Sequence, residues 1–161
     1  MNLKLLPVLL FVSIAFAGCL KDSSQSVSHV NDVNVSLTGT WTQNNNTTNY
    51  YGADSTVVYT YRGPLVNFKF DGDKTVTETD TSSVIKTGSY TINTESEFDY
   101  INISGNSTGT HQYKIERLQS RSLGLSETLT SAAGIVINTG THNVTYYKSV
   151  QVSNYSKNNL Q

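Results

Sequence analysis

The sequence predicts an all-β fold, an antiparallel up-and-down barrel of about eight strands with no substantial helix in the mature domain. Apolar and polar residues alternate with a period of two in many short runs, the pattern of strands with one buried face. Clusters of Gly, Asn and Ser separate most of these runs. From Leu37 onward no convincing stretch has the 3.6-residue period of an amphipathic helix. Successive strands without intervening helices favour a barrel or sandwich over a parallel α/β sheet.

Composition excludes several classes of protein. The chain has 161 residues, a formal net charge of −1 and one Cys. Such a charge provides no basic field for a nucleic-acid backbone, so no nucleic-acid partner is expected. One Cys can form neither an internal disulfide framework nor a Cys-rich zinc site. Ser, Thr and Asn make up 57 of the residues, and we expect them in polar linkers and on the solvent faces of strands, where Thr keeps its β-branching without adding charge.

Residues 1–18 have the layout of a secretory signal peptide. Lys4 supplies one positive charge, and an apolar run from Leu5 to Ala17 follows it. The run has thirteen residues, whereas a helix needs roughly twenty apolar residues to cross a bilayer. We therefore expect this segment to be removed rather than to remain as a membrane span.

Phe16-Ala17-Gly18-Cys19 resembles a bacterial lipobox, the signal after which a lipoprotein is lipidated and cut. Ala17 and Gly18 are small enough for a peptidase cleft, and Cys19 provides the only thiol in the chain. An ordinary signal peptide followed by an incidental Cys is the alternative. Lipidation of Cys19 would anchor the mature protein to a membrane without spanning it, since each buried methylene contributes about 0.8 kcal/mol.

The residues after Cys19 bear on where the anchor lies. Lys21 and Asp22 resemble, in part, the surface-export signal of Bacteroidota lipoproteins. We expect a lipid anchor in the bacterial cell envelope, at the outer membrane, with exposure at the cell surface as a further option. Residues 19–36 are polar and lack apolar periodicity, so they are expected to form a flexible tether from the lipidated Cys.

The barrel domain is expected over residues 37–152. In Val66-Asn67-Phe68-Lys69-Phe70 the apolar side chains share one face, Asp71-Gly72-Asp73 follows as a turn, and residues 74–79 resume a strand, which predicts a hairpin. Further strands are predicted from Thr40, around 56–61, and at 88–93, 100–104, 111–118, 122–130 and 143–152. Tyr50–Ser55 and Ser131–Thr141 are expected to be longer loops, and residues 153–161 a frayed tail.

Alternation assigns a set of large side chains to the apolar face of these strands. Its aromatic members, which could line a ligand cavity, are Phe68, Phe70, Tyr90, Tyr113 and Tyr146. The other members are Trp41, Val76, Ile92, Ile101, Ile103, Ile115, Leu123, Leu125 and Val144. In an eight-stranded barrel the same side chains can instead fill the interior completely. The sequence leaves both arrangements open.

Gly39-Thr40-Trp41 opens the predicted barrel and is followed by FKFDGDKTVT, GSYTIN and a closing NVTYYKSV strand. Together these residues resemble the lipocalin-like domains of Bacteroidota lipoproteins over roughly residues 37–150. The resemblance implies that Gly39 lets the chain bend at the base of the barrel and that Trp41 plugs that end beneath an Arg, for which Arg117 and Arg121 are both candidates. The chain lacks the C-terminal helix and the second motif of classical lipocalins.

No motif predicts catalysis, a metal site or a cofactor. His29, His111 and His142 are isolated in the sequence, and the last two are expected to be polar residues at strand ends. Asp71-Gly72-Asp73 cannot provide the six or more oxygen ligands that calcium needs. We therefore expect no enzyme, although His111 or His142 in a cleft beside a carboxylate would make catalysis a candidate.

The expected function is that of a membrane-anchored, lipocalin-like lipoprotein that binds a small apolar or amphipathic ligand in its barrel. The alternative is a filled barrel that displays its loops to a protein or glycan and has no small-molecule ligand. An enclosed apolar cavity above roughly 300 Å³ would favour the first function. A filled barrel beside an exposed aromatic patch would favour the second.

Overall fold

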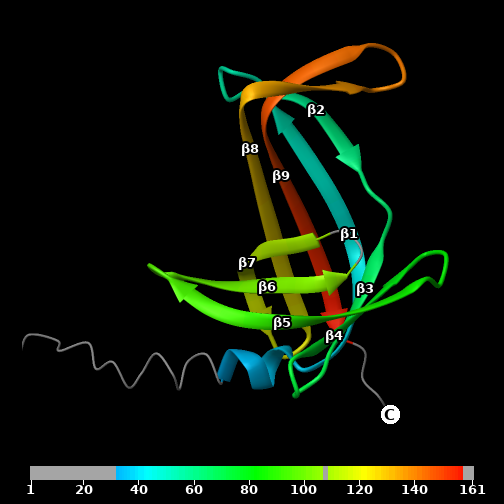
Figure 1. The fold of residues 1–161 in the computed structure, drawn as a ribbon, viewed down its shortest axis with the longest axis vertical. Coiled ribbons are helices and arrows are strands. Elements are labelled where there is room, and N and C mark those ends of the chain that lie inside the picture. The colour runs from blue at the N-terminus through cyan, green and yellow to red at the C-terminus, as the bar shows by residue number, and fades with distance from the viewer. Residues whose placement is uncertain (1–31, 107–108, 158–161) are drawn as a thin grey trace, which may run out of the picture.

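The computed structural model describes residues 32–106 and 109–157. The strands are β1 Gly39–Tyr51, β2 Val57–Arg62, β3 Val66–Phe70, β4 Thr75–Asp80, β5 Ile85–Glu95, β6 Phe98–Asn106, β7 Gly109–Gln119, β8 Ser122–Asn138 and β9 Asn143–Lys157. They pair in the order β2-β1-β3-β4-β5-β6-β7-β8-β9, and β9 also pairs with β1. Strands β1 and β3–β9 thus close an eight-stranded antiparallel barrel, with β2 as one extra strand (Figure 1). The predicted all-β barrel is confirmed.

Strand β1 pairs with one strand on one side and with two different strands on the other. On one side it pairs with β9 along nearly its whole length, from Trp41 opposite Lys157 to Tyr51 opposite Lys148. On the other side its first residues pair with β3 and its last residues pair with β2. Because β1, β8 and β9 have 13, 17 and 15 residues and the other strands at most 11, their ends extend beyond the barrel mouth.

This extension carries β2 alongside it and rises above the barrel in Figure 1. We call it the projecting sheet, and it comprises residues 47–51, 57–62, 128–138 and 143–150. Its four segments are neighbours in the order β8, β9, β1 and β2.

Side chains fill the interior of the barrel. The buried cluster consists of Leu37, Trp41, Phe68, Phe70, Val76, Tyr90, Ile101, Ile103, Leu123, Leu125 and Tyr155. Ile92, Tyr113 and Ile115 pack against it while partly buried. Most of the predicted apolar face is therefore core, where burial of each large side chain contributes about 1.5–3 kcal/mol. Val144 and Tyr146 are the exceptions, because they lie on β9 in the projecting sheet.

A short helix over residues 32–37 closes the base of the barrel. Val33 and Leu37, one helical turn apart, are both buried. The indole Nε1 of Trp41 donates to the Leu37 carbonyl at 2.7 Å. Residues 32–36 were expected to belong to the flexible tether, and this expectation is wrong, because the buried turn makes them part of the folded base. Residues 1–18, predicted to be a signal peptide, and residues 19–31 lie outside the described residues.

The cation above Trp41 comes from β9. Lys157 Nζ lies 5.1 Å from the centroid of the indole ring and donates to the Ser36 carbonyl at 3.1 Å. Gly39 has a φ of +133°, and a Cβ there would lie 2.6 Å from Lys157 Cε. Gly39 therefore leaves the space in which the Lys157 side chain crosses the base. Arg117, one candidate for this place, instead has Nη2 3.4 Å from Asn154 Oδ1.

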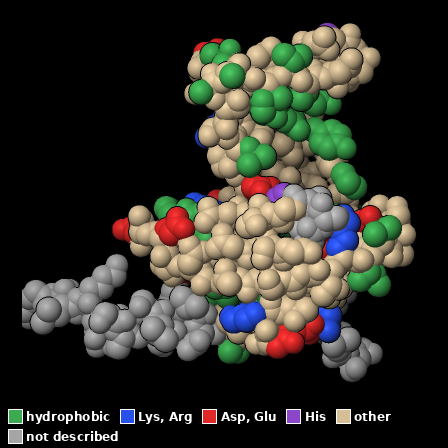
Figure 2. All heavy atoms as spheres, in the orientation of Figure 1, with side chains coloured by type: hydrophobic (Ala, Val, Ile, Leu, Met, Phe, Trp, Pro, Cys, Tyr) green, Lys and Arg blue, Asp and Glu red, His purple; other side chains and the backbone are tan. Residues whose placement is uncertain are grey.

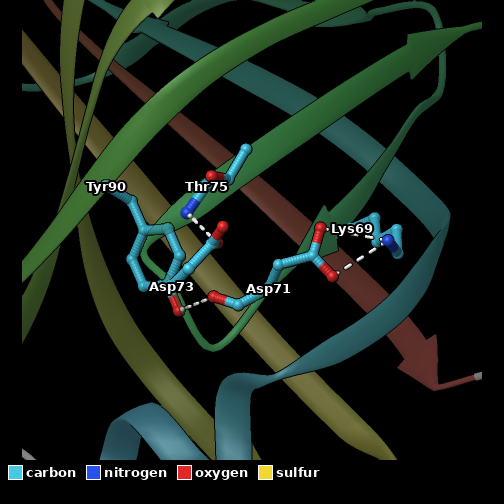
Figure 3. Close-up of polar contacts among 5 residues, drawn as sticks. All are labelled: Lys69, Asp71, Asp73, Thr75 and Tyr90. Atoms are coloured by element: carbon cyan, nitrogen blue, oxygen red, sulfur yellow. Dashed lines mark hydrogen bonds and ion pairs between the residues drawn. The ribbon is translucent and has the colours of Figure 1, made fainter.

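The hairpin predicted at Asp71-Gly72-Asp73 is present between β3 and β4. Asp73 Oδ1 accepts from the Thr75 amide at 3.0 Å, and Lys69 Nζ lies 2.9 Å from Asp71 Oδ1 (Figure 3). Hydrogen bonds from Thr75 lower the pKa of Asp73 below its ordinary value. The Tyr90 hydroxyl lies 2.9 Å from the Asp71 carbonyl oxygen, so the turn is joined to the core (Figure 3).

Three segment boundaries differ from those expected. Ser131–Thr141 is mostly strand, because β8 continues to Asn138 past a shift in register between Thr130 and Ile135. Tyr50 and Tyr51 belong to β1 rather than to a loop. The frayed tail does not begin at residue 153, since β9 runs to Lys157 and buries Ser153 and Tyr155. Residues 158–161 lie outside the described part of the chain.

Candidate functional site

The barrel interior becomes polar at its mouth, which is the end nearest the projecting sheet. A pocket of about 170 Å³ lies there, and we call it the mouth pocket. Its lining residues are Gln43, Asn46, Val66, Phe68, Glu78, His111, Tyr113, Gln151 and Tyr155. Three aromatic rings form its floor, with the Phe68 centroid 6.4 Å from that of Tyr113 and 5.6 Å from that of Tyr155. The pocket is smaller than the roughly 300–1,000 Å³ typical of small-molecule sites.

Gln43 is the buried amide that ties the strands together beneath this pocket. Its Nε2 donates to the Tyr155 hydroxyl at 3.2 Å, and its Oε1 accepts from the Val66 amide at 2.5 Å. Its own backbone amide donates to Asn67 Oδ1 at 3.1 Å. The Gln43 amide thus links β1, β3 and β9, and its polar atoms gain partners that offset the cost of their burial.

A hydrogen-bonded pair and an ion pair lie at the mouth. His111 Nδ1 lies 2.8 Å from Glu127 Oε1, and Lys86 Nζ lies 3.7 Å from Glu78 Oε1. Burial raises the pKa of Tyr113 well above its ordinary value, and the carboxylates of Glu127 and Glu78 raise it further. Burial likewise raises the pKa of Tyr155. Both phenols are therefore neutral at physiological pH, and each keeps its hydroxyl proton as a donor.

His111 thus meets the condition stated for catalysis, since it lies in a cleft beside a carboxylate. A carboxylate that holds an imidazole can make it a general base toward a hydroxyl or a water. The hydrogen bond between His111 and Glu127 also joins two polar side chains across the open end of the barrel. His142 lies elsewhere, in the turn after β8, with its Nδ1 2.9 Å from Thr141 Oγ1.

Asn46 lies between the mouth pocket and the connection from β2 to β3. Its Nδ2 donates to the Pro64 carbonyl at 2.8 Å, which fixes the amide against the connection between β2 and β3. Its Oδ1 is buried and has no hydrogen-bond partner among the described residues. A buried acceptor without a partner costs about 1–3 kcal/mol, and because this oxygen has almost no accessible surface, an occupant of the pocket does not reach it.

An aromatic cluster lies above the pocket on the projecting sheet. The Tyr50 ring stacks on Tyr59 at 5.8 Å and meets Tyr146 edge-on at 4.7 Å, measured between centroids. Partial burial, and then the nearby hydroxyls of Tyr146, Tyr59 and Tyr61, raise the pKa of Tyr50 above its ordinary value. Leu129 lies on the side of Tyr50 because both pair opposite Ser149, and Ile135 lies beside Tyr146, with which it pairs. We call this surface the tyrosine face, formed by Tyr50, Tyr59, Tyr61, Leu129, Ile135 and Tyr146.

The tyrosine face is exposed and almost free of charge. Tyr61 is 45% exposed and Leu129 59% exposed. Figure 2 shows hydrophobic side chains gathered over the projecting sheet. Residues 128–147 contain no Asp, Glu, Lys or Arg. Along β1 the inward-facing residues run from Asn46 in the mouth pocket through Thr48 to Tyr50, so pocket and face form one continuous surface.

The predicted ligand-lining residues are distributed over three places. Phe70 and Tyr90 are buried in the core, Phe68 and Tyr113 form the floor of the mouth pocket, and Tyr146 belongs to the tyrosine face. Tyr50 and Ile135 lie in the segments 50–55 and 131–141, which were expected to be loops that could face a partner, whereas Tyr59, Tyr61, Leu129 and Tyr155 were not predicted as site residues. The alternation in Val57-Val58-Tyr59-Thr60-Tyr61 indicates a strand with Tyr59 and Tyr61 on the same face. Cys19, predicted to be lipidated, lies outside the described residues.

A second hollow lies at the base, between the short helix and β7. It has a volume of about 320 Å³ and is lined by Asp32, Val33, Ser36, Asp99, Ile115, Glu116, Arg117 and Leu118. It is an open groove rather than an enclosed cavity. In the part of the chain that the structure describes, no three potential metal-ligating side chains come together. No helix there is long and apolar enough to cross a membrane.

Comparison with protein families, with curated proteins and with solved structures found no match to this chain.

Proposed function

We propose that this chain is a lipid-anchored, lipocalin-like binding module whose working surface is the tyrosine face, which it presents to a protein or glycan. The observation that carries the proposal is a filled barrel beside an exposed aromatic surface. The interior is occupied by the buried side chains of the core, and the mouth pocket holds about 170 Å³. This arrangement favours the alternative function over a ligand enclosed within the barrel.

The projecting sheet is a single layer with apolar side chains exposed on both faces. Leu129 lies on the tyrosine face, while Val136, which is 62% exposed, points to the opposite side because it follows Ile135 on the strand. Antiparallel sheets normally bury one face against a core or another layer. Exposed apolar side chains grouped in this way are typical of an interaction surface.

The tyrosine face is located far from the proposed anchor. The described chain enters through the helix at the base, whereas β1 runs from Gly39 at the base to Tyr51 in the projecting sheet (Figure 1). At about 3.3 Å per residue, this strand spans about 40 Å. A tether joined to lipidated Cys19 would hold the base near an outer-membrane surface and direct the tyrosine face away from it.

Neighbouring tyrosines on β1 provide a matched test of the proposed surface. Tyr50 lies on the tyrosine face, whereas Tyr51 faces the other side, where Lys148 Nζ lies 5.5 Å from its ring centroid. Saturable binding of the labelled protein to envelope preparations of its host should fall at least tenfold in Tyr50→Ser and change little in Tyr51→Ser.

Treatment of the envelope with protease or with periodate then identifies the partner as protein or glycan. Equal binding by the two tyrosine variants would refute the proposed surface. Native mass spectrometry that recovers a small molecule bound one-to-one would instead support a ligand in the barrel.

The proposed anchor has a separate test. Cys19→Ala should leave the protein unprocessed or soluble, because the thioether cannot form. Cys19→Ser is the closest control in size. Unchanged membrane partition and processing in both variants would contradict lipidation at this residue.

The proposal gives His111 and Glu127 a structural role rather than a catalytic one. Their bond closes the barrel mouth between β7 and β8. His111→Asn should therefore lower stability and leave binding to the envelope unchanged. Hydrolysis of an ester or amide substrate by the wild-type chain that disappears in His111→Asn would overturn this assignment.

A further inference from the structure

Strand β2 has one side of its backbone unpaired. It pairs with β1 on one side, and in the described part of the chain no strand pairs with the other side (Figure 1). Its residues are Val57-Val58-Tyr59-Thr60-Tyr61-Arg62, and all but the half-buried Tyr59 are exposed. Valine, tyrosine and threonine are side chains that favour a strand. An exposed apolar edge of this kind is a site where a further strand can be added to a sheet.

The pairing of β2 with β1 determines which backbone groups face the free side. The Gly63 amide donates to the Asn46 carbonyl at 3.0 Å, and the register of the two strands is regular from Tyr59 to Arg62. The backbone groups of successive residues point to alternate sides of a strand. Tyr61, like Gly63, therefore directs its amide and carbonyl at β1, whereas Thr60 directs its amide and carbonyl to the free side.

The other border of the projecting sheet is less suited to pairing. This border is β8, which beyond Ser126 pairs only with β9 in the described part of the chain. Its register with β9 shifts between Thr130 and Ile135, and Gly134 in that interval has a φ of +71°. An irregularity of this kind bends and twists an edge strand, which protects it from a straight partner. The free edge of β2 is therefore the better candidate for strand addition.

We propose that β2 pairs antiparallel with β2 of a second copy of this chain, about a two-fold axis at Thr60. Thr60 then lies opposite Thr60 of the copy, and this hydrogen-bonded pair uses the free amide and carbonyl of both residues. Tyr59 lies opposite Tyr61 of the copy in the adjacent non-hydrogen-bonded pair, where cross-strand side chains are closest. Aromatic pairs across two strands stabilise a sheet.

Charge and shape both fit a second copy. Arg62 is the one charged residue of β2, and the two-fold axis places it opposite Val58 of the copy rather than opposite itself. An axis perpendicular to the sheet keeps each face on its own side, so Tyr59 and Tyr61 of both copies join one enlarged tyrosine face. Antiparallel pairing directs the two barrels, and with them the two bases, to opposite ends of the joined sheet. With the proposed anchor at each base, such a dimer would join two facing surfaces.

The dimer is expected to be weak. The six residues of β2 are fewer than the about 20–30 residues that each partner contributes to a stable interface. Sedimentation equilibrium of the mature chain in a density-matched detergent should therefore show monomers at about 1 µM and dimers at about 1 mM. Monomers alone at the higher concentration would overturn the inference.

Two substitutions at Thr60 separate the backbone pairing from the side-chain contacts. Thr60→Pro removes the free amide without removing a hydrogen bond of the ladder with β1, and it should weaken dimerisation at least tenfold. Thr60→Val removes the hydroxyl, which donates to Asn49 Oδ1 at 2.8 Å, but keeps the amide and should leave dimerisation unchanged. Trp41 fluorescence during urea unfolding checks that both variants are folded. Equal dimerisation in the wild-type chain and both variants, or equal losses in the two variants, would refute pairing through this amide.

A cysteine at the two-fold axis locates the contact and does not depend on the proline variant. The Cα atoms of a hydrogen-bonded antiparallel pair lie about 5.5 Å apart, which is within the range of a disulfide. With copper phenanthroline as the oxidant, Thr60→Cys should give a disulfide-linked dimer. Thr128→Cys is the matched control, because register places Thr128 at the same height on the β8 edge, and it should remain monomeric. The wild-type chain, whose one Cys is Cys19, serves as the blank.

A linked dimer from Thr128→Cys but not from Thr60→Cys, or from neither variant, would overturn the inference. Binding to the host envelope is measured separately with Tyr50→Ser, so the proposed function stands or falls independently of the dimer.

Discussion

The base of the barrel allows a quantitative test of the coupling between Gly39 and Lys157. In Gly39→Ala the new Cβ would lie 2.6 Å from Lys157 Cε, so the end of the lysine side chain must move. The backbone would also retain a φ of +133°, which costs a residue other than glycine about 1–3 kcal/mol. Displaced Lys157 would lose its place over Trp41, worth about 0.5–1 kcal/mol, and its hydrogen bond to Ser36, worth about 1 kcal/mol.

We therefore expect Gly39→Ala to lower the free energy of unfolding by about 3–4 kcal/mol and Lys157→Ala by about 1.5–2 kcal/mol. In the double variant the lysine contacts are lost only once, and the Cβ meets no side chain. Its cost should fall short of the sum of the single costs by about 1.5 kcal/mol, whereas independent sites add within about 0.5 kcal/mol.

Urea unfolding measures the loss of stability in the two single variants and in the double variant. Trp41 is the only tryptophan and is fully buried, so its fluorescence reports directly on the base. Additive costs would show that Gly39 and Lys157 do not compete for space. A cost below about 0.5 kcal/mol for Gly39→Ala would show that the backbone there accepts a side chain without strain.

Three further predictions concern stability. Tyr113 and Tyr155 have raised pKa values in the folded protein. Their contribution to stability is therefore complete below the phenol pKa of the unfolded chain, near 10, and is lost as the pH rises above it. Above pH 10 the free energy of unfolding should fall by about 2.7 kcal/mol per pH unit in the wild-type chain and by half that in Tyr113→Phe. A pH-independent stability between pH 10 and 11 would contradict the burial of both phenols. Leu37→Ala should lower the free energy of unfolding in urea by about 2–5 kcal/mol, because it opens a cavity beneath Trp41. Val35→Ala, at a site 73% exposed, should lower it little. Similar losses in the two variants would show that the helix does not close the base. A chain ending at Val152 should lack a cooperative unfolding transition because it loses Tyr155 from the core, and a chain ending at Lys157 should retain it; a stable barrel ending at Val152 would contradict the role of the last turn of β9.

The sequence predicted the fold where side chains alternate clearly. Val66 to Phe70 reads as a strand because the Phe side chains point inward and Asn67 and Lys69 outward, and the structure pairs this segment with β4 as expected. The end of β9 escaped prediction because Ser153 is polar and yet buried, so the inward face carries no apolar signal. Residues 32–37 escaped because two buried side chains one turn apart are too few to define a helical period.

The candidate site was less accessible from the sequence. On β4 the inward face changes from Val76 to Glu78, and polarity alone would place Glu78 on the solvent side. The tyrosine face depends on the alignment of β1, β2 and β9, because Tyr146 is distant in sequence from Tyr50 and Tyr59 and meets Tyr50 only in the folded sheet. Such long-range pairings cannot be derived from local alternation.

The long pairing of β1 with β9 has a mechanical consequence. A partner that pulls on the projecting sheet, against an anchor at the base, would load these two strands along their length. Their hydrogen bonds lie perpendicular to the strands, so the ladder from Trp41 to Tyr51 would be sheared as a whole rather than opened one bond at a time. The load would thus be shared over the full length of the β1–β9 pairing.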